Sequence, residues 1–482
     1  MKKDRRALLV LCFIYILSFF VNPIFAAPAA ENTAGMGQGA ETCVTDGCHS
    51  LDGMVPVMGT QQLIPNMEAA VLFDVDTETL MYAFNADVPM PPASLVKIMT
   101  ALIAVEKGKL SDIVEVKQSV ISKVPDDAVS LDLLDGEKIT LENLLYGMMV
   151  GGANDAAAVI ADHISGSQEA FVAEMNRYAA ELGCKSTKFT NPHGLHAEDQ
   201  VTTARDVAKI LFHALKNPTF EKFFSAVYYT IPATNLSGEH GLASSNYLMN
   251  NTSDQVNYYD GRVTGGRTGV ADDGTRCLAA VAQSKGRKLI SIVMGSKSVY
   301  KEDGYSAISF GSFSETSQLF TMGFEGYKAV QVLYDGQVLR QSTVVNGENS
   351  IVMGPKTYAY TVLPENVSAT DLVYRYFDVK DGIVAPIASG QQLSHVQIWN
   401  GNICVAQADL FALGAVRTAL ADDTQNIQDD TQGNWYDIVI IVAVVVGGIV
   451  VILLCVRIVQ RIRLAALRKR GRRYRKNRRR SR

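Results

Sequence analysis

The spacing of apolar and polar residues predicts a mixed domain at 65–322. Two apolar runs, 69–74 and 80–84, flank a polar turn and predict a β-hairpin. Residues 94–106 have helical spacing and end before a glycine. Further elements are predicted as helices at 141–150, 155–164, 168–182 and 203–215 and strands at 265–270, 277–283 and 288–294. The order of strands, then helices, then strands predicts an α+β fold.

The helical period disappears in the next part of the chain, at 323–414. Residues 330–333 precede Asp335-Gly336, and residues 395–399 precede Asn400-Gly401. Both dipeptides are hairpin turn signals after strand-like runs. We therefore predict a small all-β domain, a sandwich, in this region.

Both ends of the chain carry uncharged apolar runs. The first follows a basic start and precedes small residues, which predicts a signal peptide at 1–29. Residues 30–64 lack periodicity and are predicted to be a flexible linker. A polar spacer at 415–436 leads to the uncharged apolar run 438–456, and we predict one membrane-spanning helix at 437–457.

The formal net charge of −4 conceals an uneven distribution of charge. Residues 2–6 carry +3 and residues 457–482 carry +14, so the residues between them carry −21. An acidic working domain disfavours nucleic acid as a partner. A basic tail at 458–482 is predicted to be cytoplasmic, because positive charge stays on the inner side of a membrane. This topology puts the folded domains on the outer face of a bacterial cell membrane. As an alternative role, the basic tail could bind nucleic acid or anionic lipid, but this needs more assumptions.

Cysteine usage fits an exported protein without a metal site. Cys43 and Cys48 are close enough for a small disulfide loop, and the sequence leaves open whether they are bridged. We expect Cys184, Cys277 and Cys404 to be isolated buried thiols. No metal-ligand spacing is present, so neither a metal nor a cofactor is predicted.

Ser94 and Lys97 are the candidate nucleophile and base. They lie three residues apart on a predicted helix, so both side chains share one face. A lysine accepts a proton from serine only when burial or nearby charge lowers its pKa. The same spacing recurs at Ser298 and Lys301, after a predicted strand and not at a helix start. We therefore assign the chemistry to the first pair.

Two further motifs follow the first in order. Gly152-Ala153-Asn154 lies between two predicted helices, and Arg267-Thr268-Gly269 lies on a predicted strand. With Ser94 and Lys97 they resemble the Ser-x-x-Lys, Ser-x-Asn and Lys-Thr-Gly set of penicillin-binding proteins and class A β-lactamases. Neighbouring phrases make the chain most similar to low-molecular-weight D-alanyl-D-alanine carboxypeptidases: Pro92-Ala93-Ser94, Lys97-Ile98-Met99-Thr100-Ala101, Asn154-Asp155-Ala156-Ala157, Asn191-Pro192-His193-Gly194-Leu195 and Asp260-Gly261.

The resemblance implies a β-lactamase/transpeptidase-like catalytic domain followed by a β domain, and an acyl-enzyme reaction on peptidoglycan stem peptides, with β-lactam antibiotics as inhibitors. By this resemblance Ser94 attacks the D-Ala-D-Ala carbonyl, Lys97 is the base, and Asn154 holds the substrate amide and the lysine.

Substrate binding is assigned in the same way to the third motif. Arg267 and Thr268 would bind the terminal carboxylate, while Gly269 would let the substrate backbone lie against the strand. The backbone N–H groups of Ser94 and Val270 would form the oxyanion hole.

The chain departs from the family pattern at two positions. Gly152 replaces the serine of the second motif, and Arg267 replaces the lysine of the third. Glycine relays no proton, whereas arginine still grips a carboxylate. A slow enzyme is expected; the alternatives are a wall-binding protein without turnover and, less favoured, a β-lactamase. His193 and Asp155 are interpreted as structural.

Overall fold

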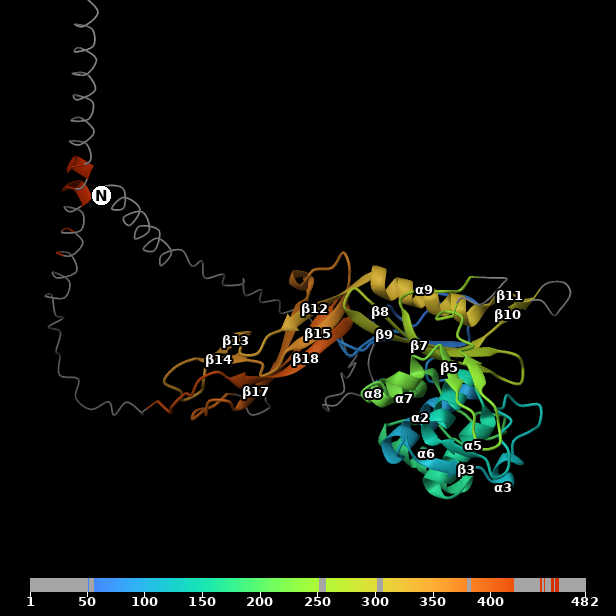
Figure 1. Cartoon of the computed structure of the whole chain (residues 1–482). Coiled ribbons are helices and arrows are strands. Elements are labelled where there is room, and N and C mark those ends of the chain that lie inside the picture. The colour runs from blue at the N-terminus through green and yellow to red at the C-terminus, as the bar shows by residue number, and fades with distance from the viewer. Residues whose placement is uncertain are drawn as a thin grey trace, which may run out of the picture. The chain divides into compact units, whose positions relative to one another are not determined.

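The computed structural model describes most of the two predicted domains (Figure 1). The predicted signal peptide, most of the linker, Cys43 and Cys48, most of the spacer and of the apolar run 437–457, and the basic tail lie outside the described residues. Within the described part, no helix combines the length and apolarity needed to cross a membrane. The described residues are 51, 56–250, 257–300, 307–378, 383–419 and a few between 443 and 458.

A five-stranded antiparallel sheet forms the centre of the first domain, in the order β2-β1-β9-β8-β7. Alternate residues of β1 face opposite sides, since Val71 and Phe73 join one buried cluster while Ala70 and Leu72 join another. Both faces of the sheet are therefore covered. The predicted hairpins are confirmed, with strands β1 (Ala69–Asp74), β2 (Thr79–Phe84), β7 (Val263–Val270), β8 (Arg276–Ser284) and β9 (Arg287–Ser296).

The helices that the sequence predicts lie where expected, with one difference. The run 141–150 is not a single α-helix: it begins as α4 (Leu141–Tyr146) and continues as η2 (Gly147–Gly151), a π-helical turn. The other major helices of this layer are α2 (Val96–Lys107), α5 (Asn154–Ser165), α6 (Gln168–Glu181), α7 (Ala204–Ala214) and α8 (Pro218–Phe224). Short elements complete the domain: η1 (Ala93–Leu95), β3 (Ile113–Glu115), α3 (Gln118–Ile121), β4 (Lys138–Thr140), β5 (Tyr228–Ile231), β6 (His240–Ala243), β10 (Ser298–Tyr300) and β11 (Ala307–Phe310).

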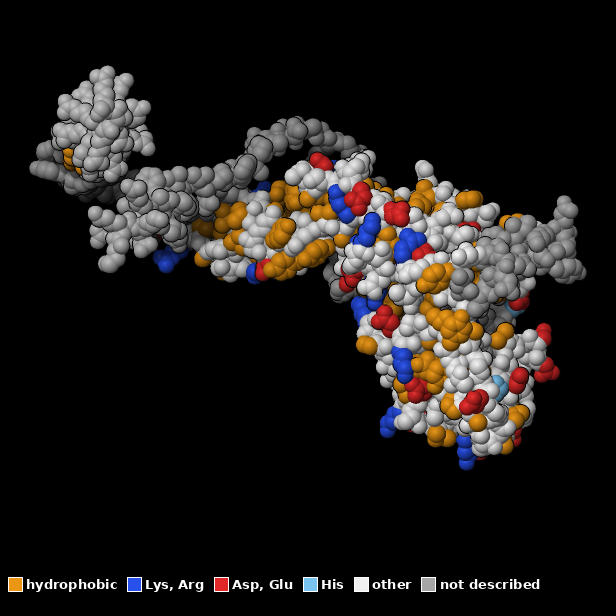
Figure 2. All heavy atoms as spheres, turned by 45° about the horizontal axis from the view of Figure 1, so that its top comes forward, with side chains coloured by type: hydrophobic (Ala, Val, Ile, Leu, Met, Phe, Trp, Pro, Cys, Tyr) orange, Lys and Arg blue, Asp and Glu red, His pale blue; other side chains and the backbone are white. Residues whose placement is uncertain are grey.

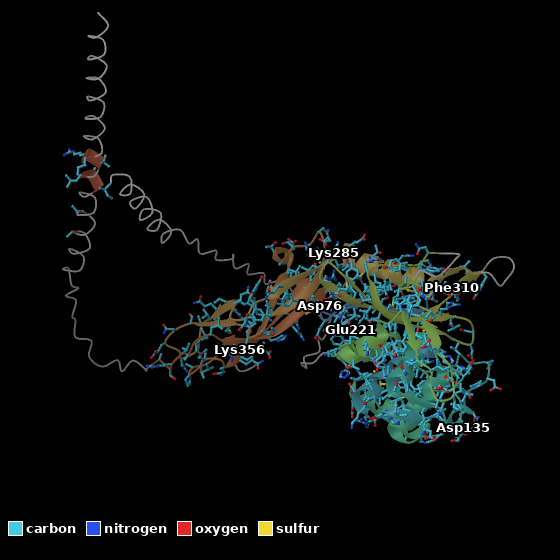
Figure 3. All side chains as sticks on the ribbon, in the orientation of Figure 1. Asp76, Asp135, Glu221, Lys285, Phe310 and Lys356 are labelled. Atoms are coloured by element: carbon cyan, nitrogen blue, oxygen red, sulfur yellow. The ribbon has the colours of Figure 1, made fainter. Side chains whose placement is uncertain are left out.

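The opposite face of the sheet is covered by α9 (Gly311–Glu325), which the sequence pattern did not reveal. This helix has no side-chain cap, and several of its residues are weak helix formers. Phe313, Phe320 and Phe324 pack it onto the sheet. Figure 3 labels a residue near each end: Phe310 immediately precedes the helix, and Lys285 donates to the Phe324 carbonyl near its end (3.2 Å).

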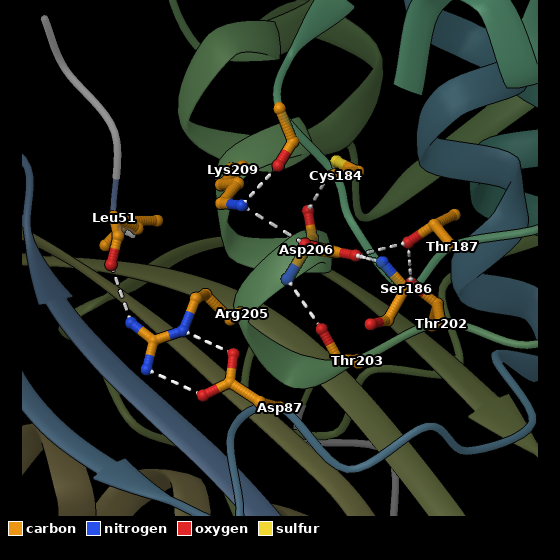
Figure 4. Close-up of polar contacts among 11 residues, drawn as sticks. Leu51, Asp87, Cys184, Ser186, Thr187, Thr202, Thr203, Arg205, Asp206 and Lys209 are labelled. Atoms are coloured by element: carbon orange, nitrogen blue, oxygen red, sulfur yellow. Dashed lines mark hydrogen bonds and ion pairs between the residues drawn. The ribbon is translucent and has the colours of Figure 1, made fainter. Parts of the chain in front are cut away.

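The segment between α6 and α7 is fixed by a buried carboxylate on α7 (Figure 4). Asp206 accepts hydrogen bonds from Ser186 N and Thr187 Oγ1, each at 2.9 Å. Lys209 lies 3.3 Å from the same carboxyl group and donates to the Gly183 carbonyl. The loop that carries Asn191–Leu195 therefore leaves from a fixed position.

The second predicted domain is all-β, as expected, and contains two antiparallel sheets. Strand β12 (Tyr327–Leu333) pairs with β15 (Ala359–Pro364). The hairpin at Asn400-Gly401 is confirmed by β17 and β18, but a hairpin at Asp335-Gly336 is wrong. A turn forms there, yet the strand after it joins the other sheet. That sheet has the order β13 (Arg340–Ser342), β14 (Ile351–Gly354), β18 (Ile403–Ala412), β17 (Gln392–Asn400) and β16 (Val373–Asp378).

Among the described residues, 343–351, 384–388 and 415–419 belong to a separate compact unit, in which Val345 bridges to Val384. Hydrophobic side chains are spread over the visible face of the β region (Figure 2).

Cys184 and Cys277 are buried as predicted, whereas Cys404 is only partly buried, because it lies near the end of the β17–β18 hairpin.

Candidate active site

Ser94 lies in η1, the 3₁₀ turn that leads into α2, and its side chain is partly exposed. The preceding residue, Ala93, has φ +47°, a left-handed conformation that a residue with a Cβ rarely adopts. Two glycines make room for this backbone. A Cβ on Gly194 would overlap the Ala93 carbonyl oxygen, and one on Gly269 would lie 3.0 Å from Ser94 N. The nucleophile position is therefore held by strained, closely packed backbone.

Lys97 is completely buried one turn further along the helix. Its Nζ lies 3.1 Å from Ser94 Oγ, 2.7 Å from Asn154 Oδ1 and 2.5 Å from the His193 carbonyl oxygen. Residues from three distant parts of the chain thus meet at one amine.

The geometry suits an uncharged amine. A neutral lysine has two N–H donors and one lone pair, which matches two carbonyl acceptors and one hydroxyl. Burial and the positive charge of Arg267 hold the pKa of Lys97 well below its usual value, against a smaller opposing effect of the Asp155 carboxylate. Lys97 is therefore arranged to accept the Ser94 proton.

Asn154 opens α5 and is held by the backbone before it. Its N and Nδ2 both donate to the Val129 carbonyl, at 2.8 and 2.9 Å, which turns Oδ1 toward Lys97. The buried Asp155 next to it accepts from Leu131 N and Leu133 N. Asp155 thus fixes the neighbouring loop, in agreement with a structural interpretation.

His193 contributes its backbone and not its ring. The ring is buried, and its Nδ1 accepts from Leu195 N at 3.2 Å. Burial is the main cause that lowers the pKa of His193 to about 3. The imidazole is therefore neutral at physiological pH and stabilises the turn whose carbonyl receives Lys97.

Arg267 lies on β7 with its guanidinium buried at 5% exposure. Nη1 donates to the Met149 carbonyl at 3.1 Å, while Nε has no hydrogen-bond partner. No carboxylate among the described residues pairs with it, and burial lowers the pKa of Arg267 to about 10. A guanidinium at this pKa remains cationic at neutral pH, so the cleft contains an unpaired positive charge.

Thr268 lies at the exposed side of the same strand. Its Oγ1 is 2.5 Å from Ser245 Oγ, a residue that sequence reasoning did not single out. Ser245 comes from the loop before β7 and belongs to no recognisable motif. The two hydroxyls form a polar pair at the exposed side of β7.

The structure brings Ser94, Lys97, Asn154 and Arg267 together, and Gly269 packs against Ser94. The second serine with this spacing to a lysine, Ser298, has a different setting. Ser298 begins strand β10 and accepts from Arg276 Nε at 3.0 Å, so it has no helix to share with a base. A small open pocket lies beside Ala93, Gly194 and Val270, next to Ser94. Among the described residues, no group of three or more His, Cys, Asp or Glu side chains could hold a metal ion.

Comparison with known families decides the assignment. The D-alanyl-D-alanine carboxypeptidase family model (peptidase S11) matches residues 58–298, which include all three motifs. The chain belongs to this family. It is therefore a serine D-alanyl-D-alanine carboxypeptidase, as the motifs predicted. A second family model, the C-terminal domain of penicillin-binding protein 5, matches residues 327–418.

Individual relatives of this carboxypeptidase agree. D-alanyl-D-alanine carboxypeptidase DacF of Bacillus subtilis is 28% identical over 358 residues, covering 73% of this chain and 86% of the relative. DacA of Haemophilus influenzae is also 28% identical, over 72% of this chain and 85% of its own length. The crystal structure of penicillin-binding protein 5 from Haemophilus influenzae has a TM-score of 0.61 at 26% identity, covering 74% of this chain and all of that one. The transpeptidase-like fold with a C-terminal β domain is thus confirmed.

Proposed function

We propose that this carboxypeptidase acts through an acyl-enzyme on Ser94 with Lys97 as the proton acceptor. The observation that supports it best is the buried Lys97 amine, which has one hydroxyl and two carbonyl partners. Ser94 Oγ gives its proton to Lys97 Nζ and attacks the carbonyl carbon between the two D-alanines. The oxyanion is stabilised by the N–H groups of Ser94 and Val270.

Collapse of the tetrahedral intermediate breaks the peptide C–N bond. The departing amine of the terminal D-Ala takes the proton from Lys97, which regenerates the neutral base. A water molecule then attacks the ester, gives one proton to Lys97 and releases Ser94 Oγ, which regains its proton. Because residue 152 has no hydroxyl, proton delivery to the leaving amine runs directly from Lys97 or through water.

Substrate recognition is assigned to the other end of the cleft. Arg267 has an unpaired, buried positive charge that suits the terminal carboxylate. Thr268 supplies a hydroxyl beside it. Gly269 packs so closely on Ala93 and Ser94 that a side chain there would displace them. Asn154 holds Lys97 and adds an amide for the substrate backbone.

The cellular setting follows from the ends of the sequence. Export by the segment 1–29 and anchoring by the apolar run 437–457 would place the catalytic domain outside the bacterial cell membrane, where peptidoglycan stem peptides are found. Deleting residues 437–482 should move the protein from the membrane fraction to the soluble extracytoplasmic fraction. Retention in the membrane after this deletion would contradict the anchor.

Mass spectrometry of the purified full-length chain tests the chemistry, with Ser94→Ala as the control. After incubation with a penicillin, we expect a penicilloyl adduct on Ser94. With a peptide ending in Lys-D-Ala-D-Ala, we expect release of one D-Ala. No adduct and no release would indicate a wall-binding protein, and rapid loss of the adduct with penicillin hydrolysis would indicate a β-lactamase.

A further inference from the structure

The two departures from the family motifs, Gly152 and Arg267, lie against each other in the cleft. A Cβ built on Gly152 would be 3.1 Å from Arg267 Nη2 and 3.7 Å from Nη1. Contacts as short as 3.1 Å require the neighbour to move by a few tenths of an ångström. A serine would add an oxygen beyond that Cβ, so the required shift would be larger.

Arg267 has little freedom to make this movement. Its guanidinium is buried, and Nη1 is bonded to the carbonyl of Met149, in the π-helical turn η2 that immediately precedes Gly152. Moving the guanidinium away from residue 152 would strain or break that hydrogen bond. It would also shift the unpaired Nε within a buried site.

The backbone at residue 152 also favours glycine. Gly152 ends η2 with φ +84°, in the left-handed region that residues with a Cβ adopt only at a cost. The turn then directs Asn154 into α5 and toward Lys97. Position 152 therefore sets both the space for the guanidinium and the start of the helix that holds the base.

We propose that Gly152 and Arg267 form an interdependent pair: the missing side chain at residue 152 provides the space in which the guanidinium lies, and Gly152 is thereby the positioning residue for Arg267. A serine at residue 152 is therefore expected to disturb the site less when residue 267 is lysine than when it is arginine.

The charge of Arg267 gives the pair a role at the base. The groups that face Lys97 are Ser94 from η1, Asn154 and Asp155 from α5, His193 from the loop before α7, and Arg267 from β7. Arg267 is the cation in this set, and its charge disfavours a second positive charge on Lys97. A guanidinium pushed away by a residue 152 side chain would weaken that effect.

A double-substitution cycle in the full-length chain tests the pair, with Gly152→Ser, Arg267→Lys and both together. The readouts are the rate of penicillin acylation across pH and the melting temperature. Gly152→Ser should slow acylation about tenfold more in the wild-type Arg267 background than in the Arg267→Lys background. It should also move the acidic limb of the pH profile upward only where Arg267 is present.

The matched control is Gly166→Ala. Gly166 also has a left-handed φ (+79°), but a Cβ there would meet nothing within 4 Å. Its loss of melting temperature should be equal in the two backgrounds. Equal effects of Gly152→Ser in both backgrounds, on rate and on melting temperature, would overturn the pairing. If the wild-type chain forms no adduct, the proposed use of Ser94 fails, while the melting-temperature cycle still decides the pairing.

Discussion

The two ends of the cleft are built differently. At the nucleophile end, Lys97 Nζ has three protein partners within 3.1 Å. At the end proposed to bind the substrate carboxylate, the Arg267 guanidinium is also buried but has one carbonyl partner and an unpaired Nε. The hydrogen bonds of Lys97 are all made within the protein, whereas the charge of Arg267 has no negatively charged partner among the described residues. The fold therefore aligns Lys97 by itself, and a bound anion would contribute binding energy at Arg267.

The largest effect on the rate should come from replacing Lys97, whose amine has three protein partners. Lys97→Met fills the volume but removes the proton acceptor, so acylation by penicillin should slow by about 10² to 10⁴-fold. Time-resolved intact-mass measurement gives the rate. Lys107→Met, on the exposed end of the same helix, is the control. An adduct that forms in Lys97→Met at the wild-type rate would exclude Lys97 as the base.

Removing the charge of Arg267 should affect binding more than alignment. Arg267→Gln should raise KM for the peptide about 10- to 10²-fold, because a charged hydrogen bond contributes about 1.5–3 kcal/mol. It should also move the acidic limb of kcat/KM to higher pH, since the Arg267 charge now lowers the pKa of Lys97.

The control for this change is Arg276→Gln, on the adjacent strand, whose guanidinium lies over the Phe310 ring. It should leave the acidic limb in place. An unshifted limb together with an unchanged KM in Arg267→Gln would refute both assigned effects of this arginine.

At the nucleophile end, His193 should make the free energy of unfolding depend on pH. Its pKa of about 3 in the fold lies below the usual 6.5, so the folded state loses stability as pH falls from about 6.5 toward 3. At pH 5 the loss relative to neutral pH is about 2 kcal/mol. Urea unfolding at pH 7 and pH 5 should show a smaller difference for His193→Gln than for wild type. Identical differences would mean that the ring already titrates normally.

The smallest effect is expected at the exposed edge of the cleft. Ser245→Ala removes the neutral hydrogen bond that holds the Thr268 hydroxyl in place. Such a bond contributes about 0.5–1.5 kcal/mol, so KM for the peptide should rise about 2- to 10-fold. Thr268→Val removes the hydroxyl itself and should act in the same direction and at least as strongly. Steady-state kinetics on both variants measures this; a fall in kcat with constant KM would instead assign the hydroxyls to catalysis.

The parts of the site that were predictable are those set by local spacing. Ser94, in the 3₁₀ turn η1, and Lys97, in α2, meet because residues three apart along a helical segment share a face. Asn154 was found because its motif follows in order along the chain. The acceptors that fix these side chains, the carbonyls of Val129 and His193, have no signature in the sequence, because every residue carries a carbonyl.

The same limit applies to the fold. The hairpin β1–β2 was predicted because its pairing is local. Asp335-Gly336 gave a turn signal but no hairpin, since β12 pairs with the distant β15. Helix α9 was missed because burial of Phe313 and Phe320 holds it in place, not capping or helix propensity. Long-range contacts overrode local preference in both cases.

The π-helical turn η2 makes the spacing before Asn154 sensitive to insertion and deletion. A π-turn contains more residues per turn than an α-helix, so the chain between Tyr146 and Gly152 holds extra length. Excising one residue from 147–151 would favour continuous α-helix and would remove the wide turn that presents the Met149 carbonyl to Arg267. Alignment in this cleft is thus a matter of residue count as much as residue type.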